Sequence, residues 1–278
     1  MSKRFASLTA VAALAVAAAV GLAGGASGAA SLPTLTIALN GVKGISVSGS
    51  ETSGAVSIAS TFTGTAPQGP DEGPAFGLVR LKPGVSIQQA AGVVQSHHGD
   101  INALTPYGTL LSNGSPASVQ TVLTPGNYAA LNVSGNGQPG VEPFTVTASS
   151  SPAALPAASA TETAREFGFQ GPTVLRNGTI VRAQNHGWLV HMIVLVGVRD
   201  AARGQQVMAL LRAGKDKQTQ KLADQNFVEL LGPSSPGAMQ QQTLHAKPGY
   251  YVEACFMDNQ DGREHAGDGM ERLVKVVD

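Results

Sequence analysis

The chain has 278 residues, of which 42% are hydrophobic and 13% are charged. Its 18 Lys and Arg residues balance 18 Asp and Glu residues, and no block is rich in Lys or Arg, which excludes a nucleic-acid binder held by phosphate contacts. The single cysteine, Cys255, excludes a disulfide framework within the chain and any metal site built from several thiolates.

The first thirty residues have the pattern of a targeting segment. Lys3 and Arg4 precede a run of Ala, Val and Leu over residues 6–23, and small residues follow at 24–26. This order is typical of a secretory signal peptide, although an uncleaved membrane anchor is the alternative. We expect residues 1–30 to direct export, so that the mature protein is secreted or extracytoplasmic. No later segment is long and apolar enough to span a bilayer.

Residues 31–147 have the pattern of a β domain. Short alternating stretches separated by Gly, Ser and Asn turns predict strands. These stretches cover residues 35–39, 55–62, 76–81, 119–133 and 143–148, with one helical pattern at residues 86–96. The chain then becomes rich in Ser, Ala and Pro and loses its apolar periodicity over residues 148–163. This composition predicts a linker between two domains.

Residues 164–278 repeat the same order of elements. The expected elements are a strand at 191–198, a helix at 205–213, two strand stretches within 244–256 and a closing strand at 272–277. The motif Pro-Gly-x-Tyr occurs at residues 125–128 and again at 248–251. We interpret this as an internal repeat, with chance similarity of two Gly/Pro-punctuated β domains as the alternative. The sequence predicts an all-β fold of two tandem β-sandwiches, each with a short helical insertion.

Common catalytic motifs are missing from the sequence. It contains no G-x-S-x-G elbow, no H-E-x-x-H zinc helix and no phosphate-binding G-x-x-x-x-G-K-[ST] loop. The glycines at 135, 137 and 140 match a dinucleotide fingerprint by letter, but they run into a strand pattern and not into a helix, so a loop is expected. One enzymatic hypothesis is a cysteine enzyme with Cys255 as nucleophile and His265 as base. It would also need an orienting group and an oxyanion hole, which the sequence does not show. We expect no enzyme.

The C-terminal segment carries soft metal ligands. Cys255 ends a predicted strand, and His265 and Met270 follow after a turn-rich loop. A thiolate, an imidazole and a thioether select copper, and a trigonal copper site takes a second imidazole. His191, at the start of a strongly apolar strand, is the candidate for it, and Trp188 is expected to help shield the site. Taken singly, each ligand has another explanation as a buried hydrophobe, a hydrogen-bonded histidine or a core methionine.

These residues resemble a known family. The pattern Gly249-x-Tyr251-x-x-x-Cys255, followed by His265-x-x-x-x-Met270 and a Val-rich strand, resembles the C-terminal motif of cupredoxins, in particular plastocyanin-like blue-copper domains. The resemblance implies a Greek-key β-sandwich that binds one copper ion for one-electron transfer. It implies imidazole ligands from His191 and His265, the thiolate of Cys255 and an axial sulfur from Met270.

The resemblance is uneven along the chain. Residues 172–278 carry all four candidate ligands, whereas residues 33–147 resemble the family in fold only. In this first copy, Pro74 and Asn132 stand where His191 and Cys255 would be, so we expect a degenerate copy without metal.

The spacing of two ligands departs from the family pattern. Nine residues separate Cys255 from His265, more than cupredoxins commonly have. A tight turn at Asp261-Gly262 would let the chain return, and closing the longer loop costs only on the order of 1 kcal/mol.

Two functions follow from these observations. The leading hypothesis is a secreted protein that binds one copper ion for electron transfer or copper carriage, with a redox or copper-handling protein as partner. The alternative is a metal-free secreted β-sandwich that serves as a binding or structural module of the cell envelope. The sequence does not predict the oligomeric state.

Overall fold

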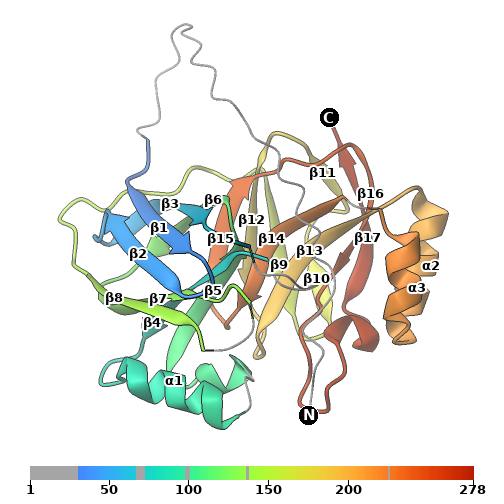
Figure 1. Cartoon of the computed structure of the whole chain (residues 1–278). Coiled ribbons are helices and arrows are strands. Elements are labelled where there is room, and N and C mark those ends of the chain that lie inside the picture. The colour runs from blue at the N-terminus through green and yellow to red at the C-terminus, as the bar shows by residue number, and fades with distance from the viewer. Residues whose placement is uncertain (1–30, 67–72, 98–100, 136–137, 225) are drawn as a thin grey trace, which may run out of the picture.

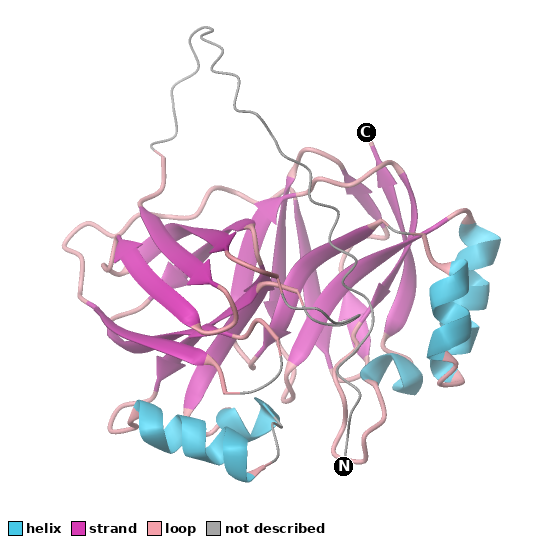
Figure 2. Ribbon diagram, in the orientation of Figure 1, coloured by secondary structure: helices cyan, strands magenta, loops and turns pink. Residues whose placement is uncertain are grey.

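The computed structural model describes residues 31–66, 73–97, 101–135, 138–224 and 226–278. The signal peptide predicted at residues 1–30 lies outside these ranges. Figure 2 shows strands through the body of the molecule and helices at its margins, which confirms the all-β class. No helix in the described ranges combines the length and the apolarity that crossing a bilayer requires.

The elements of the first half alternate between strands and short turns. They are β1 (Thr34–Asn40), β2 (Gly44–Gly49), β3 (Gly54–Thr63), β4 (Ala75–Leu81), α1 (Ile87–Ser96), the 3-10 helix η1 (Ile101–Leu104), β5 (Gly108–Gly114), β6 (Ala117–Leu123), β7 (Gly126–Asn132) and β8 (Gly140–Val146). The glycine-rich segment at residues 135–140 therefore leads into a strand, as expected.

The second half adds further strands and helices. They are β9 (Ala160–Arg165), β10 (Gly168–Gln170), β11 (Val174–Arg176), β12 (Ile180–Asn185), β13 (His191–Val198), α2 (Ala201–Arg212), α3 (Asp216–Leu222), β14 (Phe227–Ser234), β15 (Met239–Thr243), β16 (Gly249–Ala254), the 3-10 helix η2 (His265–Asp268) and β17 (Glu271–Val277). Strand β9 begins at Ala160, inside the range 148–163 predicted as a linker.

One sheet runs through both halves of the chain. Its strand order is β10-β9-β12-β15-β6-β3-β1-β2, and β15 meets β6 through the pair Gln241 and Gln120. The sheet β5-β4-β7-β8 belongs to the first half, and the sheet β11-β17-β16-β13-β14 belongs to the second half. Buried side chains from both halves form one hydrophobic cluster. The two predicted domains thus share a continuous core, with β6 and β15 side by side at the centre of Figure 1.

Hydrogen bonds reinforce the junction between the halves. The Ser235 amide donates to the Leu110 carbonyl (2.8 Å), and the Leu110 amide donates to the Ser235 hydroxyl (3.1 Å). The intervening segment also contacts both halves, because the Ala55 amide donates to the carbonyl of Ala153 (2.8 Å) and the Gln241 side chain donates to that of Pro156 (3.0 Å).

Helix α2 explains why strand β16 is buried on both faces. Asp200 caps the helix by accepting from the Arg203 amide (2.8 Å), as expected for an N-cap aspartate. Val207 and Leu211 of α2 pack in one cluster with Val252 and Ala254 of β16. Since side chains alternate along a strand, Tyr251, Glu253 and Cys255 face the opposite side, between the two sheets.

The two Pro-Gly-x-Tyr motifs adopt the same arrangement. The Tyr128 hydroxyl donates to the Thr124 carbonyl (3.0 Å), and the Tyr251 hydroxyl donates to the Lys247 carbonyl (2.7 Å). Each bond spans four residues across the turn that opens β7 or β16. The internal repeat itself stays a prediction, and these matching bonds favour it.

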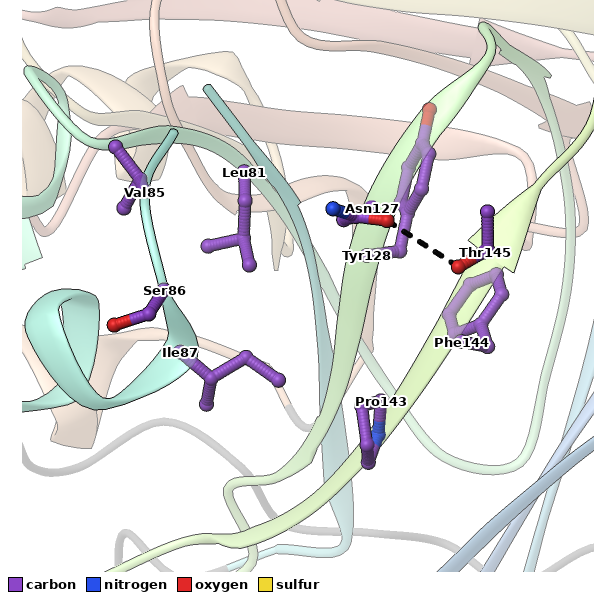
Figure 3. A pocket seen from close by; sticks show the side chains of 9 residues that line it. All are labelled: Leu81, Val85, Ser86, Ile87, Asn127, Tyr128, Pro143, Phe144 and Thr145. Carbon is purple, nitrogen blue, oxygen red and sulfur yellow. Dashed lines mark hydrogen bonds between the residues drawn. The ribbon is translucent and has the colours of Figure 1, made fainter. Parts of the chain in front are cut away.

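A shallow groove lies beside the first of these tyrosines. Figure 3 shows it between the start of α1 and strands β7 and β8, with the Tyr128 ring stacked on Phe144 at 5.3 Å between centroids. Asn127 and Thr145 hydrogen-bond each other across its wall (3.2 Å). No His, Cys or charged residue lines this groove, so it lacks the soft donors that select copper.

A half-buried glutamate at the junction predicts a pH-dependent stability. The Glu229 carboxylate accepts from the Gly114 amide (2.8 Å), and burial raises the pKa of Glu229 from 4.5 to about 7. The folded protein then binds a proton that the unfolded chain has lost, so this contribution to stability is complete below pH 4.5 and is lost as the pH rises through about 7.

Glu229→Gln is expected to remove this loss, which is on the order of 3 kcal/mol. The measurement is the free energy of unfolding in urea at pH 4.5 and pH 8 for the wild type, Glu229→Gln and the matched control Glu142→Gln in β8. An identical pH dependence in the wild type and Glu229→Gln would contradict the prediction.

Candidate metal centre

The loop that leads to His191 is fixed from both halves of the chain. The Asn185 side-chain amide donates to the carbonyls of Leu189 and Ser234, both at 2.8 Å, and its oxygen accepts from the Gly187 amide at 2.8 Å. The Val190 amide donates to the side chain of Asn102 in η1 (2.8 Å). His191 therefore enters β13 from a loop whose path is set by hydrogen bonds, and its imidazole is fully buried.

Cys255 follows the last residue of β16 and faces the interior between the sheets. Its Sγ accepts from the Met192 amide (3.4 Å) and from the Met257 amide. Hydrogen bonds to a cysteine sulfur are among the features that tune a copper–thiolate centre.

The long loop after Cys255 returns to its starting point. The Gly262 amide donates to the Asn259 carbonyl (2.9 Å), which closes a turn at the expected Asp261-Gly262 position, and Asp258 forms a bridge with Glu264. Farther back, the Ala266 amide donates to the Cys255 carbonyl (2.9 Å). The nine intervening residues thus form a hairpin whose two ends lie together.

Met270 is fully buried at the end of this loop. Gly269, with φ of +97°, turns the chain after η2 in a conformation that favours glycine. The Met270 amide then donates to the His265 carbonyl (3.0 Å), and its carbonyl accepts from the Cys255 amide (3.2 Å). The backbone of Met270 is therefore hydrogen-bonded to the backbones of His265 and Cys255. An axial role for the Met270 sulfur stays a prediction.

Three candidate donor atoms converge. His191 Nδ1 lies 3.1 Å from His265 Nδ1, and Cys255 Sγ lies 3.4 Å from His265 Nδ1 and 3.8 Å from His191 Nδ1. The circle through these three atoms has a radius of about 2.0 Å, close to the metal–imidazole bond of about 2.0–2.1 Å seen in zinc sites. An ion at its centre would be at bonding distance from the two nitrogens, and the sulfur would have to lie about 0.3 Å farther away to match the metal–thiolate bond of about 2.3 Å seen in zinc sites. The group is consistent with one copper ion, because its donors are soft.

Burial sets the protonation of these groups. It lowers the pKa of His265 to about 4, with His191 adding to the effect, and it lowers the pKa of His191 against the opposing influence of Glu166. Burial also raises the pKa of the Cys255 thiol to about 12. Both imidazoles are therefore neutral near pH 7, as metal ligands must be.

The turn between β9 and β10 covers the site. The Phe167 ring meets His265 edge-on at 5.4 Å between centroids, and Phe167 has φ of +54°, which is uncommon for a residue other than glycine. Trp188 is 82% exposed. The expectation that Trp188 shields the site is therefore wrong. Phe167 provides the cover instead, from a segment far from the ligands in sequence.

Within the part of the chain that the structure describes, His191, Cys255 and His265 are the one group of His, Cys, Asp or Glu side chains whose ligand atoms lie close enough together to hold a metal ion. Asn132, at the position expected to correspond to Cys255, is fully buried and donates its side-chain amide to the carbonyls of Gly41 (3.0 Å) and Gly44 (2.8 Å). The first half as a degenerate copy stays a prediction.

No protein-family model matches the sequence, and no curated protein matches it. Among solved structures, the chain is similar to the dithionite-reduced auracyanin of Roseiflexus castenholzii, with 14% identity and a TM-score of 0.27 over 44% of this chain and 100% of that one. It is similar to auracyanin A, a blue copper protein of Chloroflexus aurantiacus, with 15% identity and a TM-score of 0.24 over 42% of this chain and 99% of that one. These similar structures are cupredoxins.

A likeness to a copper enzyme covers more of the chain. The copper-containing nitrite reductase of Thermus scotoductus is 11% identical with a TM-score of 0.23, over 88% of this chain and 68% of that one. The cupredoxin likeness and the nitrite reductase likeness thus differ in how much of this chain they include.

Proposed function

We propose that the chain binds one copper ion through His191 Nδ1, His265 Nδ1 and Cys255 Sγ, with Met270 as a weak axial ligand, and transfers single electrons. The observation that carries the proposal is the convergence of three soft donor atoms on a circle of about 2.0 Å radius inside the core. When bound, copper would supply the exchange of one electron between its Cu(I) and Cu(II) states.

The rigidity of the donor frame favours electron transfer over copper carriage. The ligand loop is held by the Arg263–Asp268 ion pair (2.9 Å) and by the bonds of Met270 to its neighbours. All four candidate ligands are fully buried. Fixed, dry ligands limit rearrangement between oxidation states, whereas a carrier that hands over its ion would need a looser and more exposed site.

The metal-free module is disfavoured by the polar atoms in the site. The Nε2 atoms of His191 and His265 are both buried and have no hydrogen-bond partner in the described part of the chain. Each such atom costs about 1–3 kcal/mol of folding free energy. Copper bound at the two Nδ1 atoms would add binding free energy to the folded state and so offset this cost, whereas a metal-free core has no such gain.

The Cys255 nucleophile hypothesis is disfavoured by burial. Cys255 Sγ lies 3.4 Å from His265 Nδ1, a distance that a catalytic pair would also show. However, the thiol is fully buried and its pKa is raised to about 12, whereas catalytic cysteines are partly exposed and have lowered pKa values. We therefore propose an electron carrier and not an enzyme.

The wider setting of the protein is also proposed. The signal-peptide pattern of residues 1–30 favours an extracytoplasmic location. A redox protein would then be the partner, and the first half would be a metal-free copy that buttresses the copper-binding half.

The test is a titration of the purified protein with Cu(II). We expect an intense visible thiolate-to-copper absorption that saturates at one equivalent, and retention of the copper through a cycle of reduction and reoxidation. Absence of the absorption would contradict copper binding by Cys255. Release of the ion on reduction would contradict electron transfer and support carriage.

A further inference from the structure

A carboxylate from outside the ligand segments reaches the metal centre. Glu166 lies in the turn between β9 and β10, and its Oε1 accepts from the amides of Trp188 and Leu189 in the loop before His191. The same oxygen lies 3.5 Å from His191 Nε2. The carboxylate is 22% exposed, while the imidazole is fully buried. Glu166 thus connects the buried imidazole with the edge of the molecule.

His191 needs an acceptor at this place. If Nδ1 binds the metal, the ring proton must sit on Nε2, and a buried N–H without an acceptor is unfavourable. His191 Nε2 makes no hydrogen bond in the described part of the chain, and the Glu166 carboxylate is the charged group facing it. Histidine ligands commonly donate their second ring N–H to a carboxylate, which fixes the tautomer and the ring orientation.

Gly187 supplies the space for this contact. A Cβ atom at position 187 would lie 2.5 Å from Glu166 Oε1 and 2.6 Å from His191 Nε2. Both distances are far below ordinary van der Waals contact. Any side chain at this position would therefore push the carboxylate and the imidazole apart.

We propose that Glu166 is a positioning residue for His191. The Glu166 carboxylate accepts a hydrogen bond from His191 Nε2–H and so keeps Nδ1 unprotonated and directed at the metal. This inference rests on the proposed copper site. In the metal-free protein, His191 Nδ1 is then an acceptor, and His265 Nδ1–H donates to it across 3.1 Å. With copper bound, the negative charge beside His191 would favour Cu(II) over Cu(I) and would lower the reduction potential.

The test compares Glu166→Ala, Glu166→Gln and Gly187→Ala with the matched control Glu142→Gln. The first readout is nitrogen-15 NMR of the histidine rings in the metal-free proteins. We expect the wild type and the control to hold His191 as the Nε2–H tautomer, and Glu166→Ala and Gly187→Ala to lose this preference. Glu166→Gln retains an oxygen acceptor and is expected to keep the tautomer.

The second readout uses copper. Glu166→Ala and Gly187→Ala are expected to bind Cu(II) about 10–100-fold more weakly in competition with a chelator. Glu166→Gln is expected to keep the absorption and to show a higher reduction potential, because it loses the charge and retains the acceptor.

Failure of this inference differs from failure of the proposed function. A wild type without copper absorption would end the copper proposal, while the NMR tautomer would still test the role of Glu166. An unchanged His191 tautomer in Glu166→Ala would overturn the positioning role, even if the melting temperature fell. Glu166 would then only anchor the Trp188–Leu189 loop.

Discussion

Cys255→Ser is expected to abolish the visible thiolate-to-copper absorption and to weaken copper binding by more than the roughly 100-fold loss typical of an outer-shell partner. Cys255 Sγ completes a triangle with two imidazole nitrogens at 3.4 and 3.8 Å. It is the donor that becomes anionic and soft, whereas a serine hydroxyl stays protonated and hard. The measurements are the absorption spectrum and the Cu(II) affinity in competition with a chelator.

The fold is expected to tolerate this exchange. The sulfur accepts from the amides of Met192 and Met257, and a serine oxygen can accept from the same two donors. The thermal melting of metal-free Cys255→Ser therefore serves as the check that the variant is folded. A folded variant that binds copper as tightly as the wild type would contradict ligation by Cys255.

Two buried methionines provide a matched pair of controls. Met257 and Met270 both lie in the core cluster around Cys255, but only Met270 is proposed as a ligand. Replacing either by leucine conserves volume and costs less than about 1.5 kcal/mol. Met257→Leu is expected to leave the reduction potential of the copper unchanged, and Met270→Leu to raise it. The opposite pattern would assign the axial position to Met257.

Apolar and turn patterns predicted the strands well where hydrophobic side chains fill the core. The predicted strand at residues 191–198 coincides with β13, because its residues form a nearly continuous apolar run that is buried on both faces. After the predicted helix at residues 205–213, the sequence pattern predicts strand stretches only from residue 244 onward and misses β15 (Met239–Thr243), since its sequence Met-Gln-Gln-Gln-Thr has no hydrophobic alternation. Each of its glutamine side chains donates a hydrogen bond inside the fold, as when the Gln240 side-chain amide donates to the Leu230 carbonyl (2.7 Å). Periodicity cannot detect a strand that is buried through hydrogen bonds.

The candidate ligands were found from residue type and order, whereas their supports were not. Cys255, His265 and Met270 lie close in the sequence, and their soft donors carry a local signal. Glu166 and Phe167 come from a hairpin turn about a hundred residues earlier, and Asn102 comes from the first half. Nothing local in these segments indicates a metal, because their roles depend on long-range contacts of the β9–β10 turn and of η1 with the residues around His191 and His265.

Arg272→Met is expected to destabilise the metal-free protein by about 3–5 kcal/mol. The Arg272 guanidinium binds the carboxylates of Glu162 in β9 and Glu253 in β16, and it also donates to the Gly171 carbonyl (3.0 Å). Both carboxylates are fully buried, while Arg272 is 19% exposed. Without the cation, the two buried carboxyls could not both stay ionised, and folding would have to protonate at least one of them. The measurement is the free energy of unfolding in urea at pH 7.

The loss should shrink as the pH falls. Burial raises the pKa of Glu162 from 4.5 to about 8 and raises that of Glu253, so the folded state binds protons that the unfolded chain lacks. Stability from such groups is complete below 4.5 and is lost as the pH rises through the folded-state pKa. Without Arg272 this dependence steepens, and the difference between variant and wild type is expected to be smaller at pH 5 than at pH 8.

Two further variants separate the buried charges from other effects of the substitution. The triple variant Glu162→Gln, Glu253→Gln and Arg272→Met removes all three charges and is expected to recover most of the stability, since neutral groups of similar size often replace a buried ionic cluster without loss. Arg199→Met breaks an exposed pair with Asp200 and is expected to change little, because solvent screens it. If Arg272→Met changed the free energy of unfolding as little as Arg199→Met does, protonation or hydration of the two buried carboxyls would have to compensate for the loss of Arg272. The cluster would then contribute to the shape of the core and not to its stability.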